Sequence, residues 1–178
     1  MKQHPLGLFA FCPVCGSGRF VENNFKSKRC MDCGFVYYLN IAAAVAAFIL
    51  NPAGELLLCR RAKEPALGSL DLPGGFVDMG ENIEEALRRE IYEELSLKVD
   101  TTRYLFSLPN IYKYSGMEIH TLDFFFLCLV SEFDSIQAND DVGEAFFRPL
   151  NKIYPADFGL DSIKKGIIAF LNETPQIR

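Results

Sequence analysis

One stretch of the sequence, residues 75–97, combines a turn with closely spaced carboxylates, and it constrains the fold more than any other feature. Residues 82–95 contain no Pro or Gly and are rich in Ala, Leu, Arg and Glu, so we expect a helix there. Glu90, Glu93 and Glu94 recur at intervals of three and four, which places them on one side of its last turns. Like charges gathered near a helix C-terminus repel one another and are further disfavoured by the helix dipole.

A divalent cation would remove this repulsion. Carboxylate oxygens are preferred ligands of Mg²⁺, which keeps its other positions for water and phosphate oxygens. The cluster therefore predicts a site for phosphate chemistry. The alternative is a solvated acidic helix face, which is a common feature of Glu-rich helices. We favour the metal site because six residues stand at fixed intervals, namely Gly75, Glu81, Arg89, Glu90, Glu93 and Glu94.

This pattern resembles the Nudix box, which reads Gly, five residues, Glu, seven residues, then Arg-Glu-apolar-any-Glu-Glu-any-Gly-apolar. The chain departs from the box at Ser96, where the family usually has Gly. In the family that Gly follows the catalytic helix and carries no chemistry, so the departure concerns the local turn and leaves the carboxylates intact. The positions in register are Gly75, Glu81, Arg89, Glu90, Ile91, Glu93, Glu94 and Leu97.

The resemblance implies an α/β/α sandwich with a mixed sheet. It also implies hydrolysis, dependent on Mg²⁺ or Mn²⁺, of a nucleoside diphosphate linked to another group. Glu81 and Arg89 would form a structural pair that braces the loop against the helix. The implied ligands of the magnesium are Glu90 and Glu94, assisted by Glu93 and the backbone carbonyl of Gly75.

A pyrophosphate repels an incoming nucleophile, so the site must neutralise its charge and activate a water molecule. Two or three metal ions held by the glutamates of the box would serve both purposes. Members of the family often supply a further general base from outside the box. Our candidate is Glu144, which directly precedes the strand-like apolar run 145–149; the alternative is a solvated carboxylate at the end of a loop. The expected catalytic residues are therefore Glu90, Glu93, Glu94 and Glu144.

Near the N-terminus, two CxxC pairs are separated by fourteen residues, a spacing typical of tetrahedral zinc sites. Gly16 and Gly34 follow the two pairs, and residues 20–28 can form the connecting hairpin. This segment resembles a zinc ribbon, and four thiolates would make the zinc structural. Disulfides are the alternative, but nothing in the sequence suggests an oxidising compartment. The expected ligands are Cys12, Cys15, Cys30 and Cys33.

We expect two domains, a zinc ribbon at residues 1–38 and a Nudix domain at residues 39–178, in a soluble, cytoplasmic protein. The hydrophobic content of 49% is enough to fill one core. The longest apolar stretch, residues 41–50, is about half the length of a bilayer span. We interpret it as a buried strand that returns through a hairpin into residues 56–60. Further elements are strands at 70–72, 103–108, 121–130 and 145–149 and a helix at 161–171, with Cys59 and Cys128 as buried thiols.

The net charge of −5 argues against a nucleic-acid surface, because backbone binding needs a concentrated basic patch. Lys26, Lys28 and Arg29 form a small basic cluster that we interpret as a solvated face. The expected partner is a small nucleotide substrate, and related proteins are commonly homodimers. Four residues are candidates for substrate binding: Arg60 and Arg61 for its negative charge, and Tyr112 and Tyr114 for stacking on a ring, although such tyrosines can also simply pack a loop.

A zinc ribbon followed by a Nudix box is the order found in NADH pyrophosphatases and in some FAD or ADP-ribose pyrophosphatases. NADH pyrophosphatases carry Ser-Gln-Pro-Trp-Pro-Phe-Pro after the box, whereas this chain has the residues 107–112, SLPNIY, and no Trp. The choice among substrates such as ADP-ribose, NADH and FAD therefore stays open. A different hypothesis is a non-catalytic nucleotide sensor whose ribbon is an interaction module. The complete set of carboxylates argues against it.

Overall fold

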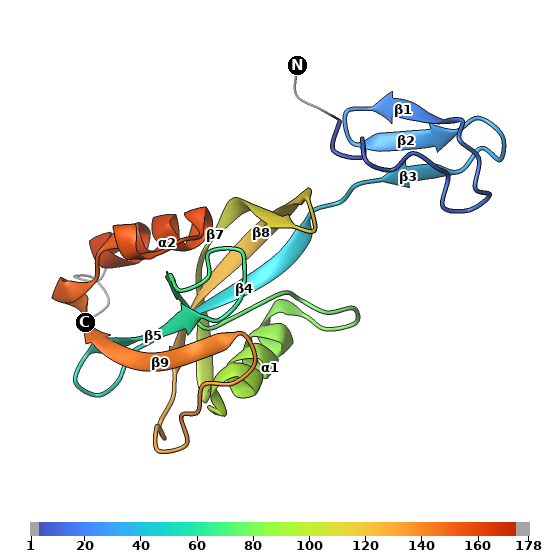
Figure 1. Ribbon diagram of the computed structural model, residues 1–178. Helices are drawn as coiled ribbons and strands as arrows, with labels where there is room; N and C mark the ends of the chain where they lie inside the picture. Colours follow the sequence, from blue (N-terminus) through green and yellow to red (C-terminus); the bar gives the residue numbers. More distant parts are fainter. Residues whose placement is uncertain (1–3, 174–178) are drawn as a thin grey trace. The chain divides into compact units, whose positions relative to one another are not determined.

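The computed structural model describes residues 4–173, and these form two compact units (Figure 1). The first unit ends at Ile41 and the second begins at Ala42. None of the helices in the described part of the chain is long and apolar enough to cross a membrane.

The N-terminal unit is a small antiparallel sheet with two glycine-containing turns. Its strands are β1 (Phe20–Asn24), β2 (Ser27–Cys30) and β3 (Val36–Tyr38), in the order β1-β2-β3. The predicted hairpin is thus present as β1 and β2. In each turn, a glycine N–H donates to the carbonyl of the first cysteine of the pair, from Gly16 to Cys12 at 2.9 Å and from Gly34 to Cys30 at 3.1 Å. Both glycines have φ near +75°, which L side chains rarely adopt.

The apolar core of this unit is very small. Its apolar cluster consists of Cys12, Phe20 and Cys30, with Phe35 packed against them, and Leu6 is buried as well. A core of this size does not stabilise a fold of about forty residues without a metal or another cross-link. The four cysteines therefore have to supply much of the stability of this unit.

The C-terminal unit contains two three-stranded sheets, with the orders β4-β8-β7 and β6-β5-β9. In the first sheet β4 and β8 are parallel, and β7 and β8 are antiparallel; the second sheet is antiparallel throughout. The elements are β4 (Ala42–Ile49), β5 (Glu55–Arg61), β6 (Leu70–Asp71), α1 (Ile83–Leu95), β7 (Thr101–Tyr114), β8 (Met117–Leu129), β9 (Val142–Pro149), the short 3-10 helices η1 (Leu150–Lys152) and η2 (Pro155–Asp157), and α2 (Asp161–Glu173).

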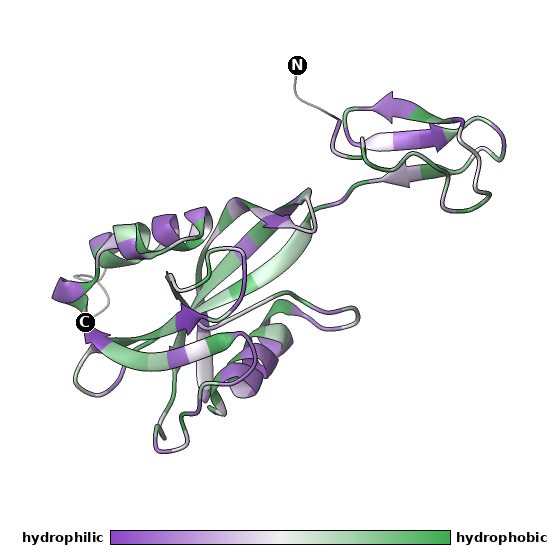
Figure 2. Cartoon of the chain, viewed as in Figure 1, coloured by the Kyte–Doolittle hydropathy of each residue, from purple (hydrophilic) through white to green (hydrophobic). Residues whose placement is uncertain are grey.

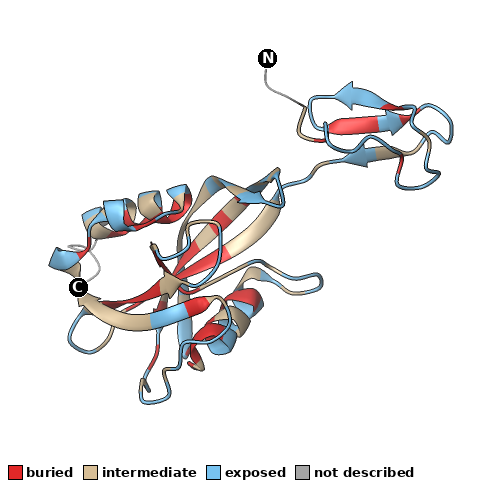
Figure 3. Ribbon diagram, in the orientation of Figure 1, coloured by how far each residue is buried: buried red, intermediate tan, exposed pale blue. Residues whose placement is uncertain are grey.

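Helices α1 and α2 cover opposite sides of the sheets. Successive side chains of a strand point to opposite faces, and β4 accordingly contributes Val45 and Ala47 to the apolar cluster that includes α1, and Ala46 and Phe48 to the cluster that includes α2. Figure 3 shows the buried residues along these strands, and Figure 2 shows that each helix has a hydrophilic outer side. The predicted α/β/α sandwich with a mixed sheet is confirmed.

The predicted hairpin between residues 41–50 and 56–60 is wrong. These segments form β4 and β5, which lie in different sheets and share the single bridge between Leu50 and Leu56. One edge of β4 pairs with β8, and the other edge bonds to residues 73–77, so neither edge is left for β5. The predicted thiols Cys59 and Cys128 are buried.

Helix α2 approaches the sheet closely at Gly166. A Cβ at this position would lie 2.8 Å from Cζ of Phe125 and closer still to Cε1. The Phe125 ring is fully buried and stacks on Phe48 and Phe106, so it has little room to move.

We therefore predict that Gly166→Ala lowers the thermal stability. A Gly to Ala change inside a helix normally stabilises by up to ~1 kcal/mol, but overpacking a core costs ~1–3 kcal/mol. We expect the melting temperature to fall by a few degrees. Circular dichroism on heating measures it, with Lys165→Ala on the exposed side of α2 as a control. A higher melting temperature for Gly166→Ala would contradict the close packing.

Candidate active site

The loop that precedes α1 is hydrogen-bonded to the edge of β4. The N–H of Val45 donates to the carbonyl of Gly75 at 2.8 Å, and the N–H of Val77 donates to the carbonyl of Ala43 at 3.0 Å. This pairing fixes residues 73–77 beside the sheet. The carbonyl of Gly75, a predicted metal ligand, uses one of its two lone pairs in this contact.

Helix α1 begins and ends with defined caps. The side chain of Asn82 accepts hydrogen bonds from the N–H groups of Glu84 and Glu85, and Glu85 bonds back to the N–H of Asn82. This capping box satisfies donors that a helix start leaves free. The helix ends at Ser96, which adopts the left-handed conformation with φ of 56°. Ser96 thus takes the conformation for which Gly is usually preferred.

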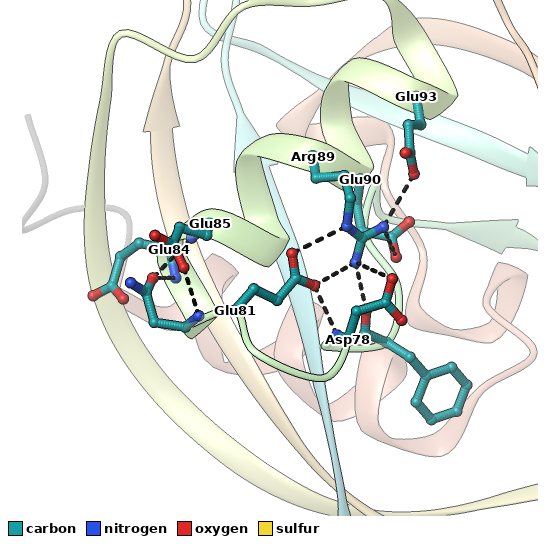
Figure 4. A network of polar contacts seen from close by, with 9 residues as sticks. Asp78, Glu81, Glu84, Glu85, Arg89, Glu90 and Glu93 are labelled. Atoms are coloured by element: carbon teal, nitrogen blue, oxygen red, sulfur yellow. Dashed lines mark hydrogen bonds and ion pairs between the residues drawn. The ribbon is translucent and has the colours of Figure 1, made fainter.

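Arg89 connects the loop to the helix. Its guanidinium donates to both carboxylate oxygens of Glu81 at 2.6 and 3.1 Å and to the carbonyl of Phe76 at 3.0 Å. It also donates to Glu90 at 2.9 Å and to Glu93 at 3.0 Å, as Figure 4 shows. These five bonds use all five N–H groups of the guanidinium. The hydrogen bonds from Arg89 lower the pKa of Glu81, and this geometry supports the predicted bracing pair.

The carboxylate of Glu90 lies close to the backbone at Gly75, and it has room there because glycine has no side chain. A Cβ at Gly75 would lie 2.5 Å from the carboxyl carbon of Glu90, so no other residue fits at position 75 without displacing this carboxylate. Burial raises the pKa of Glu90, and the ion pair with Arg89 partly offsets this effect.

Glu94 is the most buried glutamate of the cluster, with 8% of its surface exposed. Its Oε2 accepts a hydrogen bond from the N–H of Gly74 at 3.0 Å. Burial raises its pKa to about 8, and the charges of Glu90, Asp71 and Asp141 add to the shift. A carboxylate in this environment gains its charged form when a cation is near. The donor set around Glu94 and Glu90 therefore fits a hard divalent cation.

Glu94 and Gly75 border a cavity of about 530 Å³, a size in the range of small-molecule sites, whereas Glu90 is not part of its lining. The cavity is enclosed by β4, the loop before α1, β5, β6, the β7–β8 hairpin and the start of α2. Its lining includes Ala44, Ala46, Cys59, Arg61, Asp71, Gly74, Gly75, Phe76, Glu94, Asn110, Tyr112, Tyr114, Ile119, Thr121, Asp123, Asp141, Val142 and Ile163.

Three of the four predicted substrate-binding residues line this cavity. Arg61 forms an ion pair with Asp71 at 2.6 Å and donates to the hydroxyl of Tyr112 at 3.3 Å. It donates also to the carbonyl of Pro65, so two of its N–H groups have no hydrogen-bond partner among the described residues. Tyr112 packs edge-on against Phe76 at 5.5 Å, and Tyr114 is 63% exposed at the rim.

Arg60 and Glu144 are not in the cavity lining. They lie opposite each other on β5 and β9 and form an exposed ion pair at 3.0 Å. Because neighbouring side chains of a strand point to opposite faces, Arg61 faces the cavity and Arg60 does not. The acidic residue of this segment that lines the cavity is Asp141. Asp141 is not among the residues predicted from the sequence, although the pair Asp140-Asp141 just before β9 is a visible signal.

Three further polar residues of the cavity were not predicted from the sequence. Asn110, Thr121 and Asp123 lie on β7 and β8 and line the same cavity. Their signal in the sequence is an Asp within the apolar run 121–130, a position where a strand side chain is usually buried.

The four cysteines of the N-terminal unit come together in space. Their sulfur atoms all lie within 4.8 Å of one another, with 3.7 Å between Cys12 and Cys33 and 3.6 Å between Cys15 and Cys30. Zn–S bonds of about 2.3 Å in a tetrahedron place sulfur atoms about 3.8 Å apart. The arrangement therefore fits a structural zinc ion, as the ribbon prediction requires.

Comparisons with known proteins agree with the fold and identify the family. The family model for the NUDIX domain matches residues 40–170. The chain is 34% identical over 137 residues to an ADP-ribose pyrophosphatase of Methanocaldococcus jannaschii, covering 76% of this chain and 78% of the relative. It is 32% identical over 134 residues to a NAD-capped RNA hydrolase NudC of Chromobacterium violaceum, covering 75% of this chain. The chain spans 46% of the length of that NudC protein.

Solved structures show the same fold. A NUDIX hydrolase from Nitrosomonas europaea superimposes with a TM-score of 0.71 at 20% identity, covering 93% of this chain and 92% of the other. The NUDIX domain of NrtR from Shewanella oneidensis, solved with ADP ribose, superimposes with a TM-score of 0.60 at 19% identity, covering 78% of this chain and 88% of the other.

The cysteine cluster predicts the metal content of the protein. Elemental analysis of purified protein should find about one zinc per chain, and Cys15→Ser should reduce it because a ligand is lost. Cys59→Ala should retain the zinc, because Cys59 lies outside the cluster. A well-folded N-terminal unit without zinc, monitored by the amide signals of residues 12–38 in NMR spectra, would contradict the site.

Proposed function

The chain belongs to the Nudix family, and from this premise we propose that it hydrolyses the pyrophosphate bond of a nucleoside diphosphate linked to another group. The product would be a nucleoside monophosphate. The observation that carries the proposal is the buried Glu94 in the lining of the cavity, hydrogen-bonded to the N–H of Gly74, with Glu90 and Glu93 on the same side of the helix. These carboxylates repel one another unless a cation joins them, and a pyrophosphate is the substrate bond that such a cation activates.

In this proposal Glu90 and Glu94 hold Mg²⁺ or Mn²⁺, assisted by Glu93 and the carbonyl of Gly75. The cation, when bound, would neutralise the charge of the phosphates and lower the pKa of a bound water. Arg89 orients Glu90 and Glu93, and since all its N–H groups are already used it does not bind substrate.

Arg61 is the candidate for phosphate binding. Asp71 holds its guanidinium in place, and two N–H groups stay available for phosphate oxygens. Burial raises the pKa of Asp71, and the charge of Arg61 partly offsets that rise. Arg61 would therefore bring a positively charged guanidinium, held in a fixed position by Asp71, to an otherwise acidic cavity.

Asp141 is the candidate general base. It lines the cavity and is near enough to Glu94 to raise the pKa of that glutamate. Lys63 forms an ion pair with Asp141, which holds the carboxylate in place beside the cavity. Glu144 is the weaker candidate because it lies outside the cavity lining and pairs with Arg60.

Two features favour a conjugate such as ADP-ribose, NADH or a FAD-like dinucleotide over a simple phosphate ester. The cavity has aromatic walls at Phe76, Tyr112 and Tyr114 that suit a planar ring. Relatives named ADP-ribose pyrophosphatase and NAD-capped RNA hydrolase act on such conjugates according to their names. The second candidate function is a nucleotide sensor that binds without hydrolysis; the NUDIX domain of NrtR, which has the same fold, was solved with ADP ribose.

The test is hydrolysis of a panel of ADP-ribose, NADH, NAD⁺, FAD and nucleoside triphosphates with Mg²⁺, followed by chromatography of the products. We expect release of a nucleoside monophosphate, and Glu94→Gln should slow turnover by at least ~10²-fold because it removes a charge from the metal site. Glu84→Gln in the exposed first turn of α1 is the matched control. Binding without turnover across the panel would favour the sensor.

The choice between the two candidate bases gives a separate prediction. Asp141→Asn should lower kcat by ~10²-fold or more, because general base catalysis contributes about that factor. Glu144→Gln should change kcat little, since its side chain only pairs with Arg60 at the surface. The opposite ranking of the two variants would show that the base is Glu144.

A further inference from the structure

A carboxylate lies in the sheet face that forms the inner wall of the cavity. On β8, Thr121, Asp123 and Phe125 point to the same face because their positions alternate along the strand. Asp123 is 6% exposed and nevertheless borders the cavity. Burying a carboxylate is unfavourable unless it is hydrogen-bonded, so its partners indicate why it is there.

Asp123 accepts hydrogen bonds from three elements of the fold. Its Oδ1 accepts from the hydroxyl of Thr121 on β8 at 2.5 Å. Its Oδ2 accepts from the hydroxyl of Ser162 on α2 at 2.5 Å and from the side-chain amide of Asn110 on β7 at 3.1 Å. Charge-assisted bonds of this kind are short and strong, and together they hold Asp123 in one position.

This arrangement fixes the orientation of the Asn110 amide. A charged carboxylate only accepts hydrogen bonds, so Asn110 must turn its Nδ2 toward Asp123. If the amide flipped, its Oδ1 would face a carboxylate oxygen. The Oδ1 and the second N–H of Asn110 have no hydrogen-bond partner among the described residues, and Asn110 lines the cavity.

The part of this wall that β4 contributes is apolar. Ala44 on β4 lies beside Asp123 in the parallel register, and Ala46 lies beside Phe125, so this part of the wall carries only methyl groups. On β7 and β8, Tyr112 and Ile119 are opposite each other and also line the cavity. A planar ring would fit against such a wall, with its polar edge toward the amide.

We propose that Asn110, oriented by Asp123, recognises the edge of a planar ring that carries an amino donor next to an acceptor. Two groups in nucleoside diphosphate conjugates have this pattern, the adenine base and the primary carboxamide of nicotinamide. An Asn side chain pairs with the adenine edge through two hydrogen bonds in the same way. The inference deepens the proposed function and rests on it for the class of ligand.

The fixed amide makes the recognition selective. In hypoxanthine a carbonyl replaces the amino group of adenine, and in nicotinic acid a carboxylate oxygen replaces the amide nitrogen. An acceptor would then meet Oδ1 of Asn110. The amide does not flip to suit it, because Asp123 requires a donor. The protein should thus discriminate against the deaminated form of its ligand.

The first measurement compares binding of nucleoside monophosphates by calorimetry with Mg²⁺ present. The pairs are AMP with IMP, and nicotinamide mononucleotide with nicotinic acid mononucleotide. We expect one amino form to bind ~10- to 100-fold more tightly than its deaminated partner, and the pair that shows the difference identifies the ring. Equal binding within both pairs overturns the proposal. Monophosphates contain no pyrophosphate bond, so this outcome is independent of whether the protein is a hydrolase.

The second measurement assigns the discrimination to the named residues. Asn110→Leu keeps the size and removes the amide, and Asp123→Asn keeps the shape and removes the charge that orients it. Both should bring the affinity ratio close to one, whereas the exposed Asn172→Leu should leave it unchanged. A role of these residues in stability alone would lower the melting temperature of folded variants and preserve the ratio, which would overturn the proposal. Asp123→Asn decides the outcome if Asn110→Leu does not fold.

Discussion

The bonds made by Arg89 hold the candidate active site together before any metal binds. One guanidinium joins Glu81 and the Phe76 carbonyl on the loop to Glu90 and Glu93 on the helix, and no N–H is left over. Without this positive charge, the carboxylates around the end of α1 would repel one another at close range. Residues 73–77 form part of the cavity wall, place Gly75 against Glu90 and donate the Gly74 N–H to Glu94. All three features therefore depend on the position of this loop.

Features that depend on short spacing were predictable from the sequence. The box and the extent of α1 follow from intervals of at most eight residues, which fix geometry through one helix or one turn, and each CxxC pair likewise spans a single turn. Ser96 shows how far such local patterns tolerate change. Its left-handed conformation ends the helix where the family usually has Gly, and the carboxylates before it keep their positions.

Features that depend on strand register were not predictable. Hydrophobicity identified residues 41–50 as a strand, but it could not show that β8 and the loop would take both edges of it. A shift of one residue sends a side chain to the other face of a sheet. For this reason Arg61 reaches the cavity and its neighbour Arg60 does not. Asp141, just before β9, lines the cavity, whereas Glu144 does not.

The backbone pairing between β4 and residues 73–77 links the candidate site to the most stable part of the fold. Active-site loops are often the first segments to open locally, independently of the core. Here the N–H of Val45 on β4 donates to Gly75 in the loop, and the N–H of Val77 in the loop donates to Ala43 on β4. The loop therefore cannot detach without exposing an edge of the sheet. The hydrogen exchange of these two amides should be nearly as slow as that of the core, and the opening of the catalytic loop would be one step in the unfolding of the whole domain.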